Sequence, residues 1–123
     1  MYEVEFYYDE NGKSEIVEML DELGERAATS KTERINREKI LVYIGVLAKH
    51  GTKVGQPIVK HIKDDIWELR PLRNRIFFFY WKDNRYILLH HFIKKTQKTP
   101  VRELNKAQNN LKNFLKRKEN NEY

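Results

Sequence analysis

The chain has 123 residues and a formal net charge of +6, with 40% hydrophobic and 34% charged residues. This length suits one domain with a modest core, and the apolar content argues for a folded protein. The absence of cysteine excludes disulfides, zinc–thiolate sites and cysteine nucleophiles. No apolar run approaches the roughly 20 residues that span a bilayer, and the acidic N-terminus is unlike a signal peptide. We therefore expect a cytoplasmic protein that makes no membrane contact.

The charge is unevenly distributed along the chain. Residues 66–118 hold 14 Lys or Arg against 3 Asp or Glu, a balance of +11, whereas residues 1–65 carry −3. This asymmetry predicts a molecule with one basic pole suited to nucleic acid. A solvated lysine-rich surface is the alternative interpretation.

The N-terminal half is expected to form an edge strand and two helices. Tyr2–Tyr8 alternates apolar and acidic residues, which is typical of a half-buried strand. Ser14 and Ser30 each precede apolar residues at helical spacing, so both are expected to be helix N-caps. A bend at 27–32 makes the helices a hairpin, and one unbroken helix is the alternative. The second helix should end at His50, and its predicted apolar stripe comprises Ile35, Ile40, Leu41, Ile44 and Leu47.

The following segment is predicted to be rich in strands. Residues 52–63 read as a loop, with a short strand at 58–60 as an alternative. Strand-like runs follow at Ile66–Arg70, Ile76–Trp81 and Tyr86–Ile93. The middle run is six consecutive aromatic or β-branched residues, which favours a strand buried on both faces. The polar segment after it has the length of a hairpin tip.

A last helix is predicted to begin at Thr99-Pro100 and to fray at 119–123. Its expected apolar face comprises Val101, Leu104, Ala107, Leu111 and Phe114. The order β-α-α-β-β-β-α indicates an α+β fold, with one domain over residues 1–118, a small antiparallel sheet, an N-terminal helical hairpin and a C-terminal helix. We expect the helices on one face of this sheet.

The ends of the predicted strands concentrate cations. The period of two places Glu68 and Arg70 on one face of their strand, opposite the core residues Trp67 and Leu69, so both should face outward. A cross-strand salt bridge explains such a pair on its own. However, further cations expected at the same edge outnumber the single carboxylate. They are Arg73, Arg75, Lys94 and Lys95.

Such a cluster can bind a scissile phosphate and stabilise the charge that develops when the phosphate is attacked. In RNA the attacking group can be the neighbouring 2′-OH, which needs a base, and the candidates are Glu68 and one of His90 or His91. Packing is the alternative role of these histidines. An aromatic ring at the margin of the sheet could stack on a base. The predicted RNA-binding residues are Arg73, His90, Lys98 and Tyr80.

Other chemistries lack their motifs in this chain. The histidines form no HxxxH or HxH pair, adjacent histidines on a strand point to opposite faces, and no glycine-rich phosphate loop occurs. The serines at the helix starts are explained as caps. We therefore expect no metal, no other cofactor and no small-molecule ligand.

Three segments, IWELR, NRIFFFYW and ILLHHFIKKTQKTPVRELNKA, resemble the phage-derived branch of the RelE/HigB toxins of bacterial type II toxin–antitoxin systems. The shared pattern is a W-E-L-R strand, an arginine that opens the next strand, and K-K-T-x-K-T-P before the C-terminal helix. The match covers residues 66–107, and KKTQKTP is much more specific than a basic patch.

The resemblance implies a metal-independent endoribonuclease that cleaves mRNA in the ribosomal A site by 2′-OH attack and so inhibits translation and growth. Its partners would be the ribosome, mRNA and a helix-turn-helix antitoxin of the HigA type. This chain departs from RelE proper, because Ile66 and Glu68 stand where RelE has two lysines and the last helix lacks RelE's C-terminal tyrosine. These departures leave the proton acceptor open. The implied catalytic residues are Glu68, Arg70, Arg75, Lys94, Lys95 and His91.

Two other functions fit the same fold. ParE-like toxins share the scaffold and poison DNA gyrase by protein–protein contact, which a supercoiling assay would detect. A non-catalytic RNA-binding module would bind with a strong salt dependence and give no cleavage product.

Overall fold

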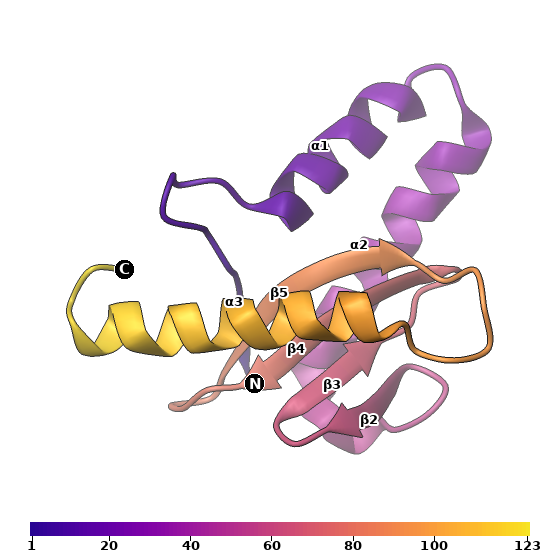
Figure 1. The fold of residues 1–123 in the computed structure, drawn as a ribbon. Coiled ribbons are helices and arrows are strands. Elements are labelled where there is room, and N and C mark those ends of the chain that lie inside the picture. Colours follow the sequence, from indigo (N-terminus) through magenta and orange to yellow (C-terminus); the bar gives the residue numbers. More distant parts are fainter.

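The computed structural model describes residues 1–123 and contains a sheet with helices packed against it (Figure 1). The expected α+β architecture is confirmed, and the optional strand near 58–60 is present as β2. The strands are β1 (Glu3–Phe6), β2 (Val59–Lys63), β3 (Ile66–Leu69), β4 (Asn74–Tyr80) and β5 (Arg85–Ile93). The helices are α1 (Glu15–Ala27), α2 (Lys31–His50), the short 3-10 helix η1 (Gly51–Val54) and α3 (Val101–Glu119).

The sheet has five strands in the order β1-β5-β4-β3-β2. Strands β2 to β5 form an antiparallel meander, because each pairs with the next strand along the chain. Strand β1 lies at one edge, as expected, but it runs parallel to β5. The sheet is therefore mostly rather than entirely antiparallel.

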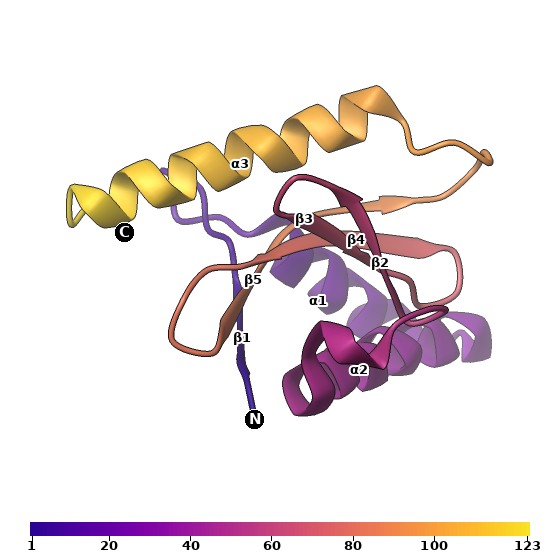
Figure 2. The same cartoon turned by 90° about the horizontal axis from the view of Figure 1, so that it is seen from below.

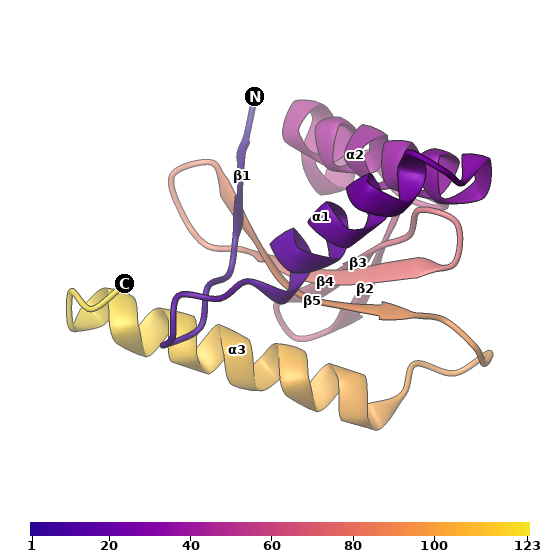
Figure 3. The same ribbon diagram turned by 90° about the horizontal axis from the view of Figure 1, so that it is seen from above.

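Helices cover both faces of the sheet, so the expectation that they share one face is wrong (Figures 2 and 3). Helices α1 and α2 lie on one face and α3 lies on the other. The reason is the apolar composition of β4. Phe78 belongs to the core under α1 and α2, whereas Phe77 and Phe79 belong to the core under α3. A strand that is apolar on both faces needs a layer on each side.

The helical hairpin forms as its caps predict. The hydroxyl of Ser14 accepts a hydrogen bond from the amide of Val17 at 3.3 Å, and that of Ser30 accepts one from the amide of Glu33 at 3.2 Å. Helix α2 ends where Gly51 adopts a φ of 65°, and a Cβ there would lie 2.7 Å from the ring of Tyr2. The chain therefore needs glycine at this end of α2.

Several predicted core positions are exposed in the structure. Ile35 and Leu41 lie on flanks of α2 that turn away from the sheet, and Val101 at the start of α3 faces solvent. The helical spacing correctly predicts α2, but the buried face of this helix is narrower than its apolar face, because only Ile40 and Leu47 are fully buried in it. Helix α2 thus carries apolar side chains that this chain does not cover.

The C-terminal residues do not fray in this structure. The hydroxyl of Tyr123 accepts a hydrogen bond from the amide of Tyr8 at 2.6 Å and donates one to the carbonyl of Phe6 at 3.2 Å. Its ring packs against Phe114 with 4.8 Å between the ring centroids. The end of the chain is docked beside β1.

Candidate functional site

A hollow of about 700 Å³ lined by six cations opens over β2, β3 and β4, beside the loop that joins β5 to α3. We call it the basic hollow. Arg70 and Arg75 are ion-paired with Glu68. The other four cations of the hollow have no carboxylate within ion-pair distance. The hollow is lined by Lys60, Arg70, Arg73, Arg75, Lys94, Lys95, Thr96 and Gln97.

The carboxylate of Glu68 lies beneath these cations. Glu68 shares its sheet face with Arg70, as predicted, but the expectation that it faces outward is wrong, because it is only 1% exposed. Its Oε1 lies 3.4 Å from Nε of Arg70 and 3.6 Å from Nε of Arg75, while its Oε2 has no hydrogen-bond partner. Burial raises the pKa of Glu68 and outweighs the opposing effect of the two arginines.

Arg75 is held in place by the turn between β3 and β4. One of its terminal nitrogens, Nη1, donates hydrogen bonds of 2.8 Å to the carbonyls of Leu72 and Asn74. Its Nε points to Glu68, and burial lowers the pKa of its guanidinium. Arg75 therefore links the turn to the buried carboxylate with little side-chain freedom, which suits a group that must meet a phosphate in a fixed orientation.

The KKTQKTP segment enters the hollow because the backbone ties its start to the same turn. The amide of Lys94 donates a hydrogen bond of 2.8 Å to the carbonyl of Arg73. This bond places Lys94 and Lys95 beside Arg73, although the residues belong to separate parts of the chain. The loop then leaves the sheet towards α3 (Figure 1).

Asn74 fixes the turn from below. Its side chain is buried, donates hydrogen bonds to Oδ1 of Asn36 at 2.7 Å and to the carbonyl of Pro71 at 3.1 Å, and accepts one from Nε2 of His91 at 2.9 Å. One amide side chain thus joins α2, the turn and β5. Because each buried polar group has a partner, this network holds the cations of the turn in a defined position.

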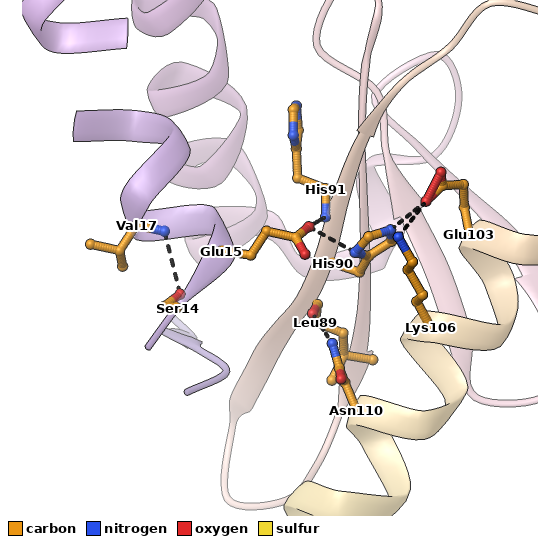
Figure 4. Close-up of polar contacts among 9 residues, drawn as sticks. All are labelled: Ser14, Glu15, Val17, Leu89, His90, His91, Glu103, Lys106 and Asn110. Atoms are coloured by element: carbon orange, nitrogen blue, oxygen red, sulfur yellow. Dashed lines mark hydrogen bonds and ion pairs between the residues drawn. The ribbon is translucent and has the colours of Figure 1, made fainter. Parts of the chain in front are cut away.

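The two adjacent histidines point to opposite faces of the sheet, as predicted, and neither lines the basic hollow (Figure 4). His90 turns towards α3, where its ring nitrogens lie 2.7 Å from Glu15 and 2.8 Å from Glu103. Burial alone would lower the pKa of His90, but the hydrogen bonds to both carboxylates outweigh it and raise the pKa. His90 therefore joins the starts of α1 and α3.

His91 lies on the opposite face, with its ring against Asn74. Burial lowers the pKa of His91 to about 4, so the ring is neutral near pH 7 and Nε2 donates to Asn74. His91 also lines a neighbouring hollow of about 650 Å³, which shares Lys95 and Thr96 with the basic hollow. Its position explains a packing role, and its role as catalytic base stays a prediction.

The remaining predicted RNA-binding residues lie apart from the basic hollow. Tyr80 is at the far end of β4, where its hydroxyl accepts a hydrogen bond from the amide of Asn84 at 3.0 Å. Lys98 is exposed in the loop, and its carbonyl accepts a hydrogen bond from Thr96. Of the predicted set, the structure brings together Glu68, Arg70, Arg73, Arg75, Lys94 and Lys95.

Sequence reasoning missed three residues of the basic hollow. Lys60 is expected in a loop or in the optional short strand at 58–60, without a role in the site, and it lies in β2, where it is paired with Glu68 across the sheet. The sequence VKHIK of β2 does not alternate between apolar and polar residues, so it gives little sign that Lys60 faces the hollow. Thr96 and Gln97 belong to KKTQKTP and reach the hollow through the fold of the loop, which leaves no local signal.

The arrangement suits an anion with several oxygens. Guanidinium groups form bidentate hydrogen bonds to phosphate, and ammonium groups add charge without a fixed direction. The hydroxyl of Thr96 and the side-chain amide of Gln97 can complete the contacts. Cations gathered around one point also stabilise charge that develops there during a reaction.

The sequence of this chain matches a family model described as phage-derived protein Gp49-like (DUF891) over residues 13–112. The chain belongs to this family. Gp49-like proteins are a toxin-like family of toxin–antitoxin systems, so the expected resemblance to a phage-derived toxin family is confirmed. Membership implies an antitoxin as partner. No curated protein matches the chain, and no helix of the Gp49-like chain is both long and apolar enough to cross a membrane.

Proposed function

We propose that this Gp49-like protein is the toxin of a toxin–antitoxin pair and that it cuts mRNA on the ribosome. The supporting observation is the basic hollow, which places six cations around one buried carboxyl group. The expected partners are mRNA, the ribosome and a helix-turn-helix antitoxin of the HigA type.

In the proposed reaction, the 2′-OH of one nucleotide attacks the adjacent phosphorus. The bond to the 5′-oxygen of the next nucleotide breaks, leaving a 2′,3′-cyclic phosphate on one fragment and a 5′-hydroxyl on the other. One proton leaves the attacking oxygen and one joins the leaving oxygen. Arg73, Lys94 and Lys95 bind the phosphate and stabilise its added charge.

Glu68 acts on the reaction through the two arginines that it contacts. A phosphate in the hollow competes with Glu68 for Arg70 and Arg75, and the buried carboxylate keeps both guanidinium groups turned to the same point. The raised pKa of Glu68 and its unpartnered Oε2 also suit a proton acceptor. The pH dependence of cleavage by a Glu68→Gln variant separates these roles: an orienting group changes the rate, and a base also changes the profile.

The test is to map RNA 5′ ends on ribosomes after brief induction of the protein. Wild type should cut translated mRNAs, whereas Lys95→Gln and Arg73→Gln should lose about ten-fold or more of the cleavage. Lys112→Gln is the matched control, because this exposed lysine of α3 lies outside the basic hollow. Intact mRNA during growth arrest would overturn the proposal, and blocked DNA supercoiling would then indicate a gyrase inhibitor.

A further inference from the structure

A second hollow lies next to the first and is bordered by exposed aliphatic side chains. Ile35 is 46% exposed, Leu72 is 51% exposed and Ile93 is 52% exposed. They belong to α2, to the turn between β3 and β4, and to the end of β5, and together they line a hollow of about 440 Å³. We call it the apolar hollow. Large aliphatic groups from three elements that meet at one exposed place indicate a binding surface.

Leu72 holds its exposed position at a conformational cost. Its backbone has a φ of 58°, in the left-handed region that a leucine rarely adopts. Glycine or asparagine would fit this turn with less strain, and the side chain recovers little burial within the chain. A bulky side chain that is strained and solvent-exposed is understandable when another molecule covers it.

Helix α2 extends this surface. Val42 is the next exposed aliphatic residue on the stripe of Ile35, two turns or about 10 Å further along the helix. Between them, the exposed Glu38 and Lys39 occupy the positions three and four after Ile35, so this side of α2 is apolar at two points with charged groups between them. The stripe faces away from the sheet, so nothing in the chain occupies it.

The apolar hollow is continuous with the basic hollow. Arg73 lines both, and Lys94, whose amide is bonded to the carbonyl of Arg73, follows Ile93 directly. A molecule that covers the exposed aliphatic groups therefore comes within reach of an uncompensated positive charge. Glu33 also lines the apolar hollow, but it is paired with Arg26 at 3.6 Å, so charge complementarity favours a molecule that is acidic on the side nearest Arg73.

We propose that the apolar hollow seats an acidic amphipathic helix of the antitoxin. Its apolar face packs on Ile35, Leu72 and Val42, and its carboxylates pair with Arg73 and the neighbouring lysines, which closes the basic hollow to RNA. This inference rests on the proposed function only for the identity of the blocked substrate. The helix-in-groove arrangement supplies apolar anchors, while the charged pairs fix the register.

A second copy of this chain fits the surface poorly. In a two-fold contact the same patch meets itself, so each apolar hollow would bring its adjacent basic hollow with it. Two groups of six cations would then lie near each other, which is unfavourable. The charges thus favour a different chain with acidic residues.

The test uses the protein encoded by the reading frame next to this chain's gene as the probe. Its affinity is measured by calorimetry for wild type, for Leu72→Gly, for Ile35→Ser and for the control Val101→Ser, which changes an exposed aliphatic residue at the start of α3. We expect affinity to fall about ten-fold or more for the two hollow variants and to stay unchanged for the control. Leu72→Gly should also keep or raise the melting temperature, because it relieves the strained φ.

Equal affinities for all variants would overturn the docking surface, as would failure of the probe to bind wild type. Self-association that the hollow variants abolish would also overturn it and would identify a second copy as the occupant. RNA cleavage by the free Ile35→Ser variant should match wild type, because Ile35 lies outside the basic hollow. If no variant cleaves RNA but the binding differences hold, the docking surface stands and the nuclease proposal falls.

Discussion

Glu68 is a carboxyl group in a place where ionisation is costly. It is buried, its Oε2 lacks a hydrogen-bond donor, and two guanidinium groups lie beside Oε1 at distances longer than good hydrogen bonds. The arginines reduce the cost of the charge without removing it, so the pKa stays above its ordinary value. The charge at the floor of the basic hollow therefore depends on pH.

Glu68 should weaken the fold as it ionises. Since its pKa is raised in the folded state, its contribution to stability is complete below the ordinary value of 4.5 and is lost as pH rises through the raised pKa. Compared with Glu68→Gln, wild type should therefore lose free energy of unfolding as pH rises above about 4.5. Urea titrations of both proteins measure this, and a constant difference would show that the carboxyl titrates normally.

His90 and His91 should affect stability with opposite signs. His91 has a folded pKa of about 4 against an ordinary 6.5, so its contribution rises by up to about 3 kcal/mol as pH increases through that window. His90 has a raised pKa, so its contribution is complete below 6.5 and is lost as pH rises through the folded value. Unfolding measured against pH for His90→Gln and His91→Gln should show the two trends separately. Parallel trends would refute this assignment.

At the scale of elements, the turn between β3 and β4 organises both hollows. It carries Leu72 and Arg73, is held by the guanidinium of Arg75 from one side, and rests on the buried amide of Asn74. Strand β5 meets the same turn through the amide of Lys94. Cations from β2, from β4, from the segment between β3 and β4 and from the loop after β5 consequently share one opening.

Asn74→Ala should destabilise the protein by about 1–3 kcal/mol, because it leaves Asn36 and His91 without their buried partner. A double-mutant cycle with Asn36→Ala tests the link to α2 and should give a coupling energy above about 0.5 kcal/mol. The control is Asn109→Ala on the exposed face of α3, which should change stability little. Additive effects at Asn74 and Asn36 would show that the amide pair does not hold the turn.

The sequence predicts the helices and strands well, because helix caps and strand-like runs depend on residues that are close together in the chain. The caps at Ser14 and Ser30, and the strand runs around Ile66, Ile76 and Tyr86, depend on residues close in sequence. The layers were mispredicted, although six apolar residues in succession already require cover on both faces. The parallel pairing of β1 with β5 joins distant segments, and no nearby residue indicates it.

The candidate site was predictable in part for the same reason. Alternation along β3 placed Glu68 on the same face as Arg70. The burial of Glu68 also depends on Arg75 from β4, and the spacing of residues along one strand cannot show such a neighbour. A bulge between β4 and β5 leaves Leu89 unpaired and lets both Leu89 and His90 face α3. Strict alternation cannot place a side chain beyond such a bulge.

At the scale of the whole molecule, the charge is concentrated as the sequence indicated. The basic hollow gathers six cations with one carboxyl group beneath them, while the acidic residues of α1 lie on the helix that packs against the opposite face. The apolar hollow shares Arg73 with this pole, so one partner can cover both. Binding of RNA and of an antitoxin would then exclude each other.

RNA affinity measured against salt concentration tests the central claim most directly. A short single-stranded RNA should bind wild type with a log–log slope of about −4 if all six cations meet phosphates. Lys94→Gln/Lys95→Gln should reduce that slope by about 1.4 units, since each lost contact removes about 0.7. Lys112→Gln/Lys116→Gln lowers the net charge equally on α3, outside the basic hollow, and should leave the slope nearly unchanged. Equal losses in the two double variants would contradict the account, because the RNA would then respond to net charge and not to the basic hollow.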